Sequence, residues 1–489
     1  MLSTFNTVLT KDSTTIVRSL SIDSPVYSII LERMVIHKRR YGAGAGQMML
    51  LLGSLMERCV DVIKMTNINP LLIAQTLKKC RSIINERLPA LAIHIDVHSN
   101  LAAIVRTSLS GNVLQSHWQA ATKLVKAVMD LVPSLSSRSY HIHTVAGDSA
   151  STLDSQLANS SVIAGLLFKS TFTYAGAESL SKSIDNAKIL LLDIDVELKQ
   201  QREHSSLDIR SMEDYKVFAE AERKHHLSKL DTIYRNNINI VMSTKSIGDL
   251  AIQEFAQRPN MSCHGRIEAQ VMERITHALG GVVQSSLIEL SPSDSFYATC
   301  STYRQVLIGG DSYELFHSSV EAKQQDKYAT VLLCGSTRQF LDEAEVGLSD
   351  AIKTTRAIIQ AGTNDAPPNV VIGGGALETA LALYLDQSKM SLTSDKESLV
   401  FGIVVDGLRS MVMTLADNSG RNGSLLADEL TQQQRNTGNH KIGIDVTANG
   451  EVIGDLSSST STQVYESYQS KRALINEALD LAVLFLSLY

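Results

Sequence analysis

Three short segments carry residue types that could contact a phosphate group or a metal ion. Residues 10–15 (TKDSTT) place the carboxylate of Asp12 among several hydroxyl groups. Residues 42–46 (GAGAG) stand directly before a run of Met and Leu, and residues 373–375 (GGG) stand where a strand-like run meets a helical pattern. Because a glycine-rich turn before a helix presents backbone N–H groups to an anion, both glycine segments are candidate phosphate loops.

Each segment also has a purely structural interpretation. A TKDSTT sequence is typical of a capped turn, and a glycine triplet before a helix often serves only close packing. The chain has no Walker-type motif and no dinucleotide G-x-G-x-x-G in a strand–helix setting. The residues alone therefore leave phosphate binding and simple turns both open.

Asp350 is the one acid that stands out in the later helical run, at residues 337–362. It lies off the apolar stripe that includes Leu341, Leu348 and Ile352, so spacing alone favours a solvated face. The adjacent residues His225 and His226 cannot share one helix face. The histidine pattern therefore predicts no metal site.

Composition limits the class of protein. The chain has 489 residues, enough for about three domains, with 44% apolar residues, and its net charge of −6 implies no basic face for nucleic acid. Five cysteines without a C-x-x-C pair favour reduced intracellular thiols over a disulfide framework. The longest uncharged stretch, residues 41–56, is shorter than the ~20 residues that span a bilayer. We expect a cytoplasmic protein with no membrane or nucleic-acid partner.

The elements that position these segments follow a helical, mixed, helical order. Amphipathic spacing predicts helices over residues 47–65, 70–91 (with Pro89 as the end) and 117–132. Compact apolar runs predict buried strands within residues 187–198, 237–244 and 328–335, with a long polar helix capped by Ser211 between the first two. A hairpin with an Asn449-Gly450 turn and a last helix follow. This order suggests that one domain is inserted into another.

The segments also stand in the order of a known family, the group II chaperonins, which the chain resembles over nearly its whole length. TKDSTTIV resembles T-N-D-G-A-T-I-L, GAGAG stands where the family has G-D-G-T-T, and FLDEAEVGLSDAI is similar to E-x-E-R-x-L-x-D-A. VIGGGALE matches V-x-G-G-G-A-x-E, and VYES matches V-W-E-P. Stretches such as SMEDYKVFAEAE and LIGGDSYELF are most similar to eta-type subunits of the eukaryotic cytosolic chaperonin TRiC.

The resemblance implies a multidomain fold. A mostly α equatorial domain would comprise residues 1–138 and 369–489. A small α/β intermediate domain would comprise residues 139–187 and 333–368, and an α/β apical domain with a helical lid protrusion would comprise residues 188–332. This agrees with the insertion that the order of the elements suggests.

The resemblance also implies roles for single residues. Asp350 would be the catalytic carboxylate that orients water for γ-phosphate hydrolysis, and Glu466 would face the ribose. The cofactor would be ATP or ADP with Mg²⁺. The implied nucleotide-binding residues are Asp12, Gly42, Gly44, Gly46, Ser110, Gly373, Gly374, Gly375, Glu466 and Lys471.

The GAGAG loop departs from the family pattern. Ala43 replaces the Asp that binds Mg²⁺ in the family, and Ala45 and Gly46 replace two Thr. Alanine has no oxygen to coordinate a hard cation. We therefore expect no metal ligand at position 43, a weakened Mg²⁺ site and a weak or inactive ATPase. Departures at both chain ends put contacts with neighbouring subunits in doubt.

The function implied is that of a subunit in an eight-membered double ring, which encloses and folds unfolded cytosolic proteins such as actin or tubulin. The ring would run on ATP although this subunit's own site is weak. One alternative is a chaperonin-like scaffold that binds partners without an ATP cycle. An unrelated ATP-dependent enzyme would need a substrate pocket, for which the sequence has no motif.

Overall fold

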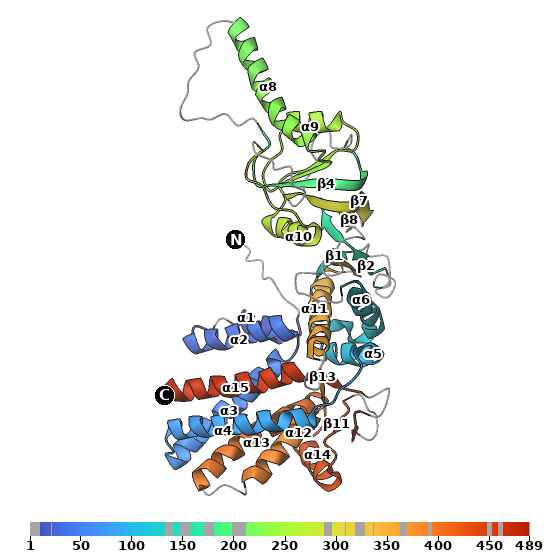
Figure 1. Ribbon diagram of the computed structural model, residues 1–489. Coiled ribbons are helices and arrows are strands. Elements are labelled where there is room, and N and C mark those ends of the chain that lie inside the picture. Colours follow the sequence, from blue (N-terminus) through green and yellow to red (C-terminus); the bar gives the residue numbers. More distant parts are fainter. Residues whose placement is uncertain are drawn as a thin grey trace, which may run out of the picture. The chain divides into compact units, whose positions relative to one another are not determined.

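The computed structural model describes most of the chain, and its contacts divide the chain into two compact units (Figure 1). Unit 1 comprises Met1–Val125 and Asp342–Tyr489, and unit 2 comprises Lys126–Leu341. The middle of the sequence thus forms one unit and both ends form the other, as the insertion predicts. The described residues are 10–20, 22–132, 140–146, 157, 159–170, 180–197, 212–287, 296–308, 310–317, 328–335, 337–361, 369–389, 394–446, 452–457 and 463–488.

Unit 1 is mostly helical. Four long helices, α3, α4, α13 and α15, pack side by side around one apolar core that contains Leu55, Ile84, Phe401 and Ile475 (Figure 1). The helices of unit 1 are α1 (Ser13–Ser19), α2 (Pro25–Tyr41), α3 (Ala45–Thr66), α4 (Pro70–Leu91), α5 (Val97–Ser108), the 3₁₀ helix η1 (Val113–His117), α12 (Ala376–Lys389), α13 (Asp395–Asn418), α14 (Gly423–Thr437) and α15 (Tyr468–Leu488). Two further helices, α6 (Trp118–Leu131) and α11 (Arg338–Ala361), cross the boundary between the units.

The predicted helices are present, with one wrong boundary. Pro89 lies inside α4, which continues to Leu91, because Leu88 and Leu91 are buried and hold the last turn against the core. Among the described helices, α13 alone is long and apolar enough to cross a bilayer by length and composition. Its residues Val404 and Leu408 are buried in the core, which is the usual setting of such a helix in a water-soluble fold.

Two short antiparallel strand pairs connect the helices of unit 1. β10 (Val370–Ile372) pairs with β13 (Tyr465–Ser467), which brings the glycine triplet next to the end of the chain. β11 (Ile442–Ile444) pairs with β12 (Ile453–Asp455), so the predicted hairpin is confirmed, although its Asn449-Gly450 turn lies outside the described residues.

Unit 2 is built on a six-stranded sheet in the order β3-β8-β7-β4-β5-β6. Side chains alternate between the two faces of β4. Leu191 therefore packs with helix α10, and Leu190 packs with helices α8 and α9. The strands are β3 (Leu166–Lys169), β4 (Ser183–Leu192), β5 (Ile240–Ser243), β6 (Ser262–His264), β7 (Ala298–Ile308) and β8 (Asp311–His317), and the helices are α8 (Met212–Arg235), α9 (Asp249–Ala256) and α10 (Ala269–Leu279).

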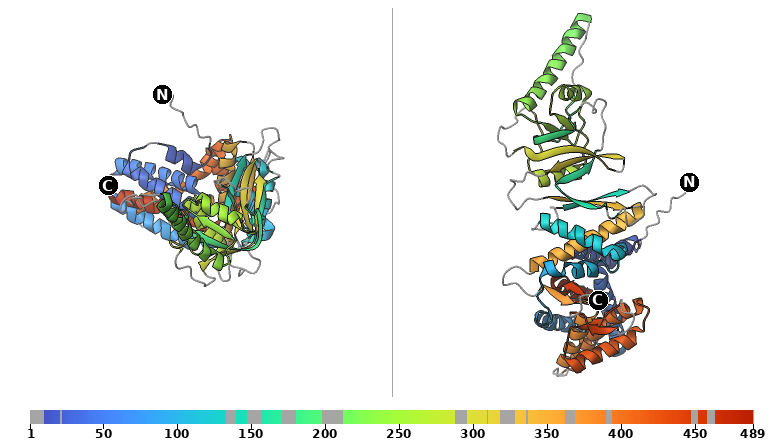
Figure 2. Two further views of the ribbon diagram at one scale, coloured as in Figure 1. Left: turned by 90° about the horizontal axis from the view of Figure 1, so that it is seen from above. Right: turned by 90° about the vertical axis from the view of Figure 1, so that its right-hand side faces the viewer.

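A second, three-stranded sheet completes unit 2. Its strands are β1 (Tyr140–Ala146), β9 (Ala329–Gly335) and β2 (Ser161–Ala164), with β9 in the centre (Figure 2). The runs predicted as buried strands correspond to β4, β5 and β9 and are confirmed.

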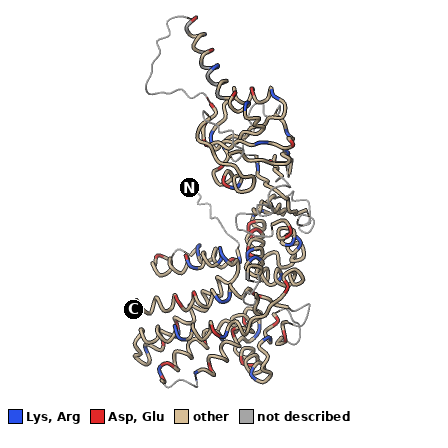
Figure 3. Tube along the Cα trace, in the orientation of Figure 1, with Lys and Arg blue, Asp and Glu red and all other residues tan. Residues whose placement is uncertain are grey.

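The long polar helix of unit 2 is α8, as predicted, while its proposed cap Ser211 lies outside the described residues. Near its start Met212, Val217 and Phe218 are exposed, whereas Leu230 and Ile233 near its end are buried against the sheet. Lys and Arg are interspersed with Asp and Glu over both units (Figure 3). The two units together confirm the predicted fold class, a helical domain with an inserted α/β part; the five-part domain division stays a prediction.

Candidate functional site

A cavity of about 660 Å³ lies inside unit 1, where the α2–α3 loop, α5, α12, β13 and α15 meet. These elements come from both ends of the sequence, and the helical core described above holds them together. The cavity wall includes the predicted residues Gly44, Ser110, Gly374, Gly375, Glu466 and Lys471. The remaining predicted residues, Asp12, Gly42, Gly46, Gly373 and Asp350, do not line it.

The α2–α3 loop forms one side of the cavity. Gly42 ends α2 with φ 81°, and Gly44 begins α3 with φ 100°, both in the left-handed region that favours glycine. A Cβ at Gly42 would lie 2.5 Å from the backbone oxygen of Asp350, so this glycine lets the loop pack directly on α11. The first turn of α3 starts at the cavity wall, where its N–H groups point outward from the helix end.

The glycine triplet forms the opposite side. The N–H of Gly373 donates to the oxygen of Val464 (3.0 Å), and the oxygen of Gly374 accepts from the N–H of Ile444 (2.8 Å). A Cβ at Gly373 would lie 2.8 Å from Oε1 of Glu466. The triplet therefore joins β11, β13 and α12 as a tight packing element, and Gly374 and Gly375 also line the cavity. Its role as a phosphate loop stays a prediction.

Lys471 lies in an ion-pair cluster at the base of the cavity. Its Nζ is 2.5 Å from Oε1 of Glu378 and 2.6 Å from Oε2 of Glu466, and it donates to Oε1 of Gln47 (2.9 Å). Only 5% of the side chains of Lys471 and Glu378 is exposed. One ammonium thus faces two carboxylates, and the cluster connects α15 to α12, β13 and α3.

Asp12 and Asp350 are joined by a second lysine, Lys38, which the sequence analysis did not single out. Its Nζ lies 2.5 Å from Oδ1 of Asp12 and 3.4 Å from Oδ2 of Asp350. Asp12 also caps α1, because its Oδ2 accepts from the N–H (3.0 Å) and the hydroxyl (2.7 Å) of Thr15. The capped-turn interpretation of TKDSTT is therefore correct, and the same carboxylate lies beside Asp350.

The two acids have opposite pKa shifts. Burial alone would raise the pKa of Asp12, but hydrogen bonds from Lys38, Thr14 and Thr15 lower it to about 2. Burial raises the pKa of Asp350 to about 6, although the charges of Lys38 and Lys353 act to lower it.

Helical spacing alone suggested a solvated face for Asp350, and the structure shows that this prediction is wrong. Its side chain is 17% exposed, because α11 packs on the α2–α3 loop at Gly42. Its Oδ1 is buried without a hydrogen-bond partner among the described residues, and Nζ of Lys353 is 3.8 Å away. This oxygen is an unused acceptor, while the Asp350 side chain does not line the cavity, and its role toward water stays a prediction.

The residues present do not fit Mg²⁺. The ion needs about six oxygen ligands at short distance, and position 43 offers only a methyl group. The carboxylates of Asp12 and Asp350 already contact the ammonium of Lys38. Within the described part of the chain, no group of three or more His, Cys, Asp or Glu residues is arranged to hold a metal ion.

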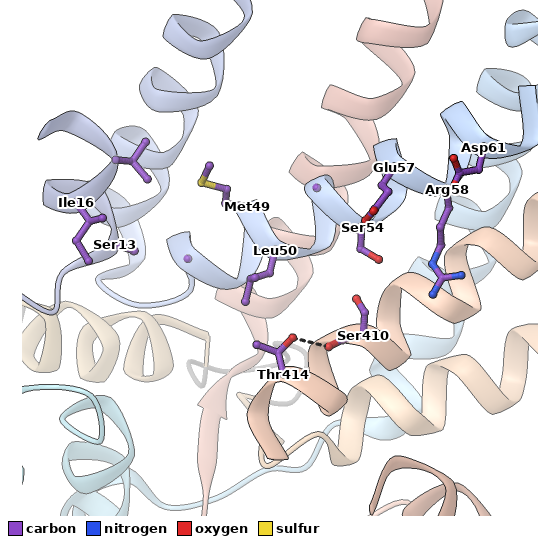
Figure 4. A pocket seen from close by; sticks show the side chains of 13 residues that line it. Ser13, Ile16, Met49, Leu50, Ser54, Glu57, Arg58, Asp61, Ser410 and Thr414 are labelled. Carbon is purple, nitrogen blue, oxygen red and sulfur yellow. Dashed lines mark hydrogen bonds between the residues drawn. The ribbon is translucent and has the colours of Figure 1, made fainter. Parts of the chain in front are cut away.

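A groove of about 920 Å³ runs along α3 beside the cavity and shares Leu50 and Thr414 with it (Figure 4). Gly46 lines this groove rather than the cavity, and a Cβ there would lie 3.1 Å from Cβ of Ser13. On the far wall the hydroxyl of Thr414 donates to the backbone oxygen of Ser410 (2.8 Å).

Several residues of the site were missed by sequence reasoning. Lys38 is one of three basic residues in the last turn of α2, where cations commonly stabilise a helix dipole, so nothing in the sequence set it apart. Glu378 lies in the GGGALE motif and could have been considered as a partner for Lys471. The wall also includes Arg106, Trp118 and Thr354, whose types gave no signal.

The model of the TCP-1/cpn60 chaperonin family matches residues 1–488. Similar curated proteins are T-complex protein 1 subunit eta of Gallus gallus (29% identical, covering 91% of this chain and 78% of that protein) and of Dictyostelium discoideum (28%, 90% and 76%). The Arabidopsis thaliana eta subunit is 27% identical and covers 98% of this chain and 83% of its own length. The chain therefore belongs to the TCP-1/cpn60 chaperonin family.

Proposed function

We propose that this chain is an eta-like subunit of a hetero-oligomeric, cytoplasmic group II chaperonin, and that its unit 1 cavity binds ATP or ADP with little or no hydrolysis. The relatives reported above are named T-complex protein 1 subunit eta, which supports assembly with other chaperonin subunits. The proposed assembly is an eight-membered double ring that encloses unfolded proteins. The proposed domains are equatorial (1–138 and 369–489), intermediate (139–187 and 333–368) and apical (188–332).

The observation that carries the nucleotide proposal is the meeting of separate family segments around one cavity. Gly44, Ser110, Gly375 and Glu466 come from four distant parts of the chain and line the same space. Its volume of about 660 Å³ lies in the range of ordinary small-molecule sites.

The charges around the cavity favour one orientation of the nucleotide. Near Glu466 two carboxylates face one ammonium, which leaves a formal charge of −1 and disfavours phosphate. A carboxylate is instead a good acceptor for the ribose hydroxyls. The phosphates would lie at the start of α3 near Gly44, where helix N–H groups attract anions.

Weak hydrolysis follows from the lost metal ligand. Phosphoryl transfer depends on cations that neutralise charge on the transferred group, and a metal ion usually supplies this. Asp350 would be the water-orienting carboxylate, but Ala43 cannot hold the metal. We expect subunit-resolved ATP turnover well below that of neighbouring subunits; equal turnover would refute this part of the proposal.

Trp118 gives a direct test of nucleotide binding, because it is the only tryptophan and lines the cavity. Titrating the full chain with ADP should change its fluorescence. Glu466→Gln should weaken ADP binding roughly tenfold, since a charge-assisted hydrogen bond becomes a neutral one. Glu429→Gln, an exposed change on α14, is the matched control and should leave the affinity unchanged. No fluorescence change and no binding by calorimetry would reject the nucleotide site.

Particle size tests the assembly. A tagged full chain expressed together with eukaryotic chaperonin subunits should sediment as a particle many times its own mass of 53.3 kDa. A well-behaved monomer at micromolar concentration would instead favour the scaffold alternative, in which the chain binds partners outside a ring.

A further inference from the structure

We propose that Lys38 is a built-in cation between Asp12 and Asp350 that keeps a divalent metal out of this cluster, so that the neighbouring cavity binds its ligand without one. Only the statement about ligand binding rests on the proposed function. The exclusion of the metal rests on the positions of the three side chains.

The geometry is that of a bridging cation. Nζ of Lys38 is 2.5 Å from Oδ1 of Asp12 and 3.4 Å from Oδ2 of Asp350. The three side chains are 14%, 11% and 17% exposed, so water screens their attraction only in part. A single ammonium thus joins the start of α1 to the middle of α11.

The backbone fixes Lys38 in this position. Its oxygen accepts the N–H of Gly42 (2.8 Å) at the end of α2, and Gly42 in turn packs against the backbone of Asp350. The lysine and its two partners are therefore held by the same contact between α2 and α11. By contrast, Lys79 in its ion pair with Glu397 has a side chain that is 57% exposed.

The charge of the cluster is already balanced. Lys353 lies 3.8 Å from Oδ1 of Asp350, so two ammonium groups face two carboxylates. Oδ2 of Asp12 is also engaged by the hydroxyls of Thr14 and Thr15. A divalent ion would have to displace Lys38 and break these contacts, and it would gain no oxygen from Ala43.

The test is a gain of metal binding on removal of the lysine. Mn²⁺ binding to the full chain, without nucleotide, is measured by electron paramagnetic resonance for the natural protein, Lys38→Ala, Lys38→Gln and the control Lys79→Ala. The natural protein and Lys79→Ala should bind Mn²⁺ equally weakly. Lys38→Ala and Lys38→Gln should bind one Mn²⁺ per chain at least about tenfold more tightly.

Trp118 fluorescence shows whether each variant is folded, and a second measurement needs no variant. ADP affinity of the natural protein should agree within about twofold in Mg²⁺ and in chelator. The proposal is overturned if Mg²⁺ raises that affinity tenfold, or if folded Lys38 variants bind Mn²⁺ no better than Lys79→Ala. Failure to bind ADP under both conditions would reject the nucleotide site, while the Mn²⁺ comparison would still decide the role of Lys38.

Discussion

Lys471 and Lys38 each join two carboxylates from distant parts of unit 1, and they differ in burial and in charge balance. Lys471 and Glu378 are 5% exposed, and the single ammonium faces Glu378 and Glu466. Glu466 is 22% exposed. The side chains of Lys38, Asp12 and Asp350 are 14%, 11% and 17% exposed, and Lys353 provides a second ammonium.

We infer from this difference that Lys471 stabilises the fold, whereas Lys38 mainly affects the chemistry of its site. A buried lysine that holds two glutamates cannot leave without stranding charge in the interior, so it acts as an anchor for α12, α15 and β13. A balanced and less buried cluster tolerates the loss of one member. The same arrangement, a lysine between two acids, therefore has two consequences. The burial of the lysine decides whether it anchors the fold or can be lost without a large effect on stability.

The largest expected effect is the loss of the anchor. Lys471→Met should lower the free energy of unfolding of unit 1 by about 3–5 kcal/mol, because it leaves Glu378 and Glu466 without their cation. Denaturant unfolding followed by Trp118 fluorescence measures this. A loss below about 1 kcal/mol would mean that the two clusters do not differ as described.

A pH series should show the next largest effect, with opposite signs at the two aspartates. The folded pKa of Asp350 is raised to about 6, so its contribution to stability falls as the pH rises from about 4 to 6. Asp350→Asn removes this term, and its stability relative to the natural protein should rise by roughly 2 kcal/mol between pH 4.5 and pH 7.5.

Asp12 provides the matched control for that series. Its folded pKa is lowered to about 2, so its contribution is present above the ordinary value near 3.8 and is lost as the pH falls toward 2. Asp12→Asn should therefore be more harmful at pH 7.5 than at pH 3. The same sign for both variants would contradict the assigned shifts.

Loss of Lys38 should have a smaller effect on stability. Lys38→Met should cost about 1 kcal/mol, because Lys353 still faces Asp350 and the hydrogen bonds from Thr14 and Thr15 still hold Asp12. The same denaturant measurement applies. A cost equal to that of Lys471→Met would show that Lys38 is also an anchor.

The smallest effect sets the baseline for any lysine–carboxylate pair. Lys79→Met breaks the exposed pair with Glu397 and should change stability by less than about 0.5 kcal/mol. If this change cost as much as Lys38→Met, the partial burial of the Lys38 cluster would add nothing to the free energy of unfolding.

The fold and much of the cavity wall could be predicted from the sequence, but the bridging lysines' roles could not. Periodicity located α3, α4 and β4 because local patterns report burial, and the order of the family segments brought Gly44 and Glu466 to one site. The prediction that the helix ends at Pro89 was wrong, because the tertiary packing of Leu91 overrides the local helix-breaking effect of proline. Lys38 was missed since its partners lie on α1 and α11, and a single sequence carries no record of which helices meet.

The bridge formed by Lys38 also bears on how such a subunit can change over generations. If position 43 alone reverted to aspartate, the new carboxylate would enter a site whose other two acids already share an ammonium. We expect that reversion to be neutral for metal binding until Lys38 is also replaced. A metal-dependent site like that of the family would then need several coordinated substitutions, because Lys38 blocks the cluster and Ala43, Ala45 and Gly46 lack the side-chain oxygens of the family loop.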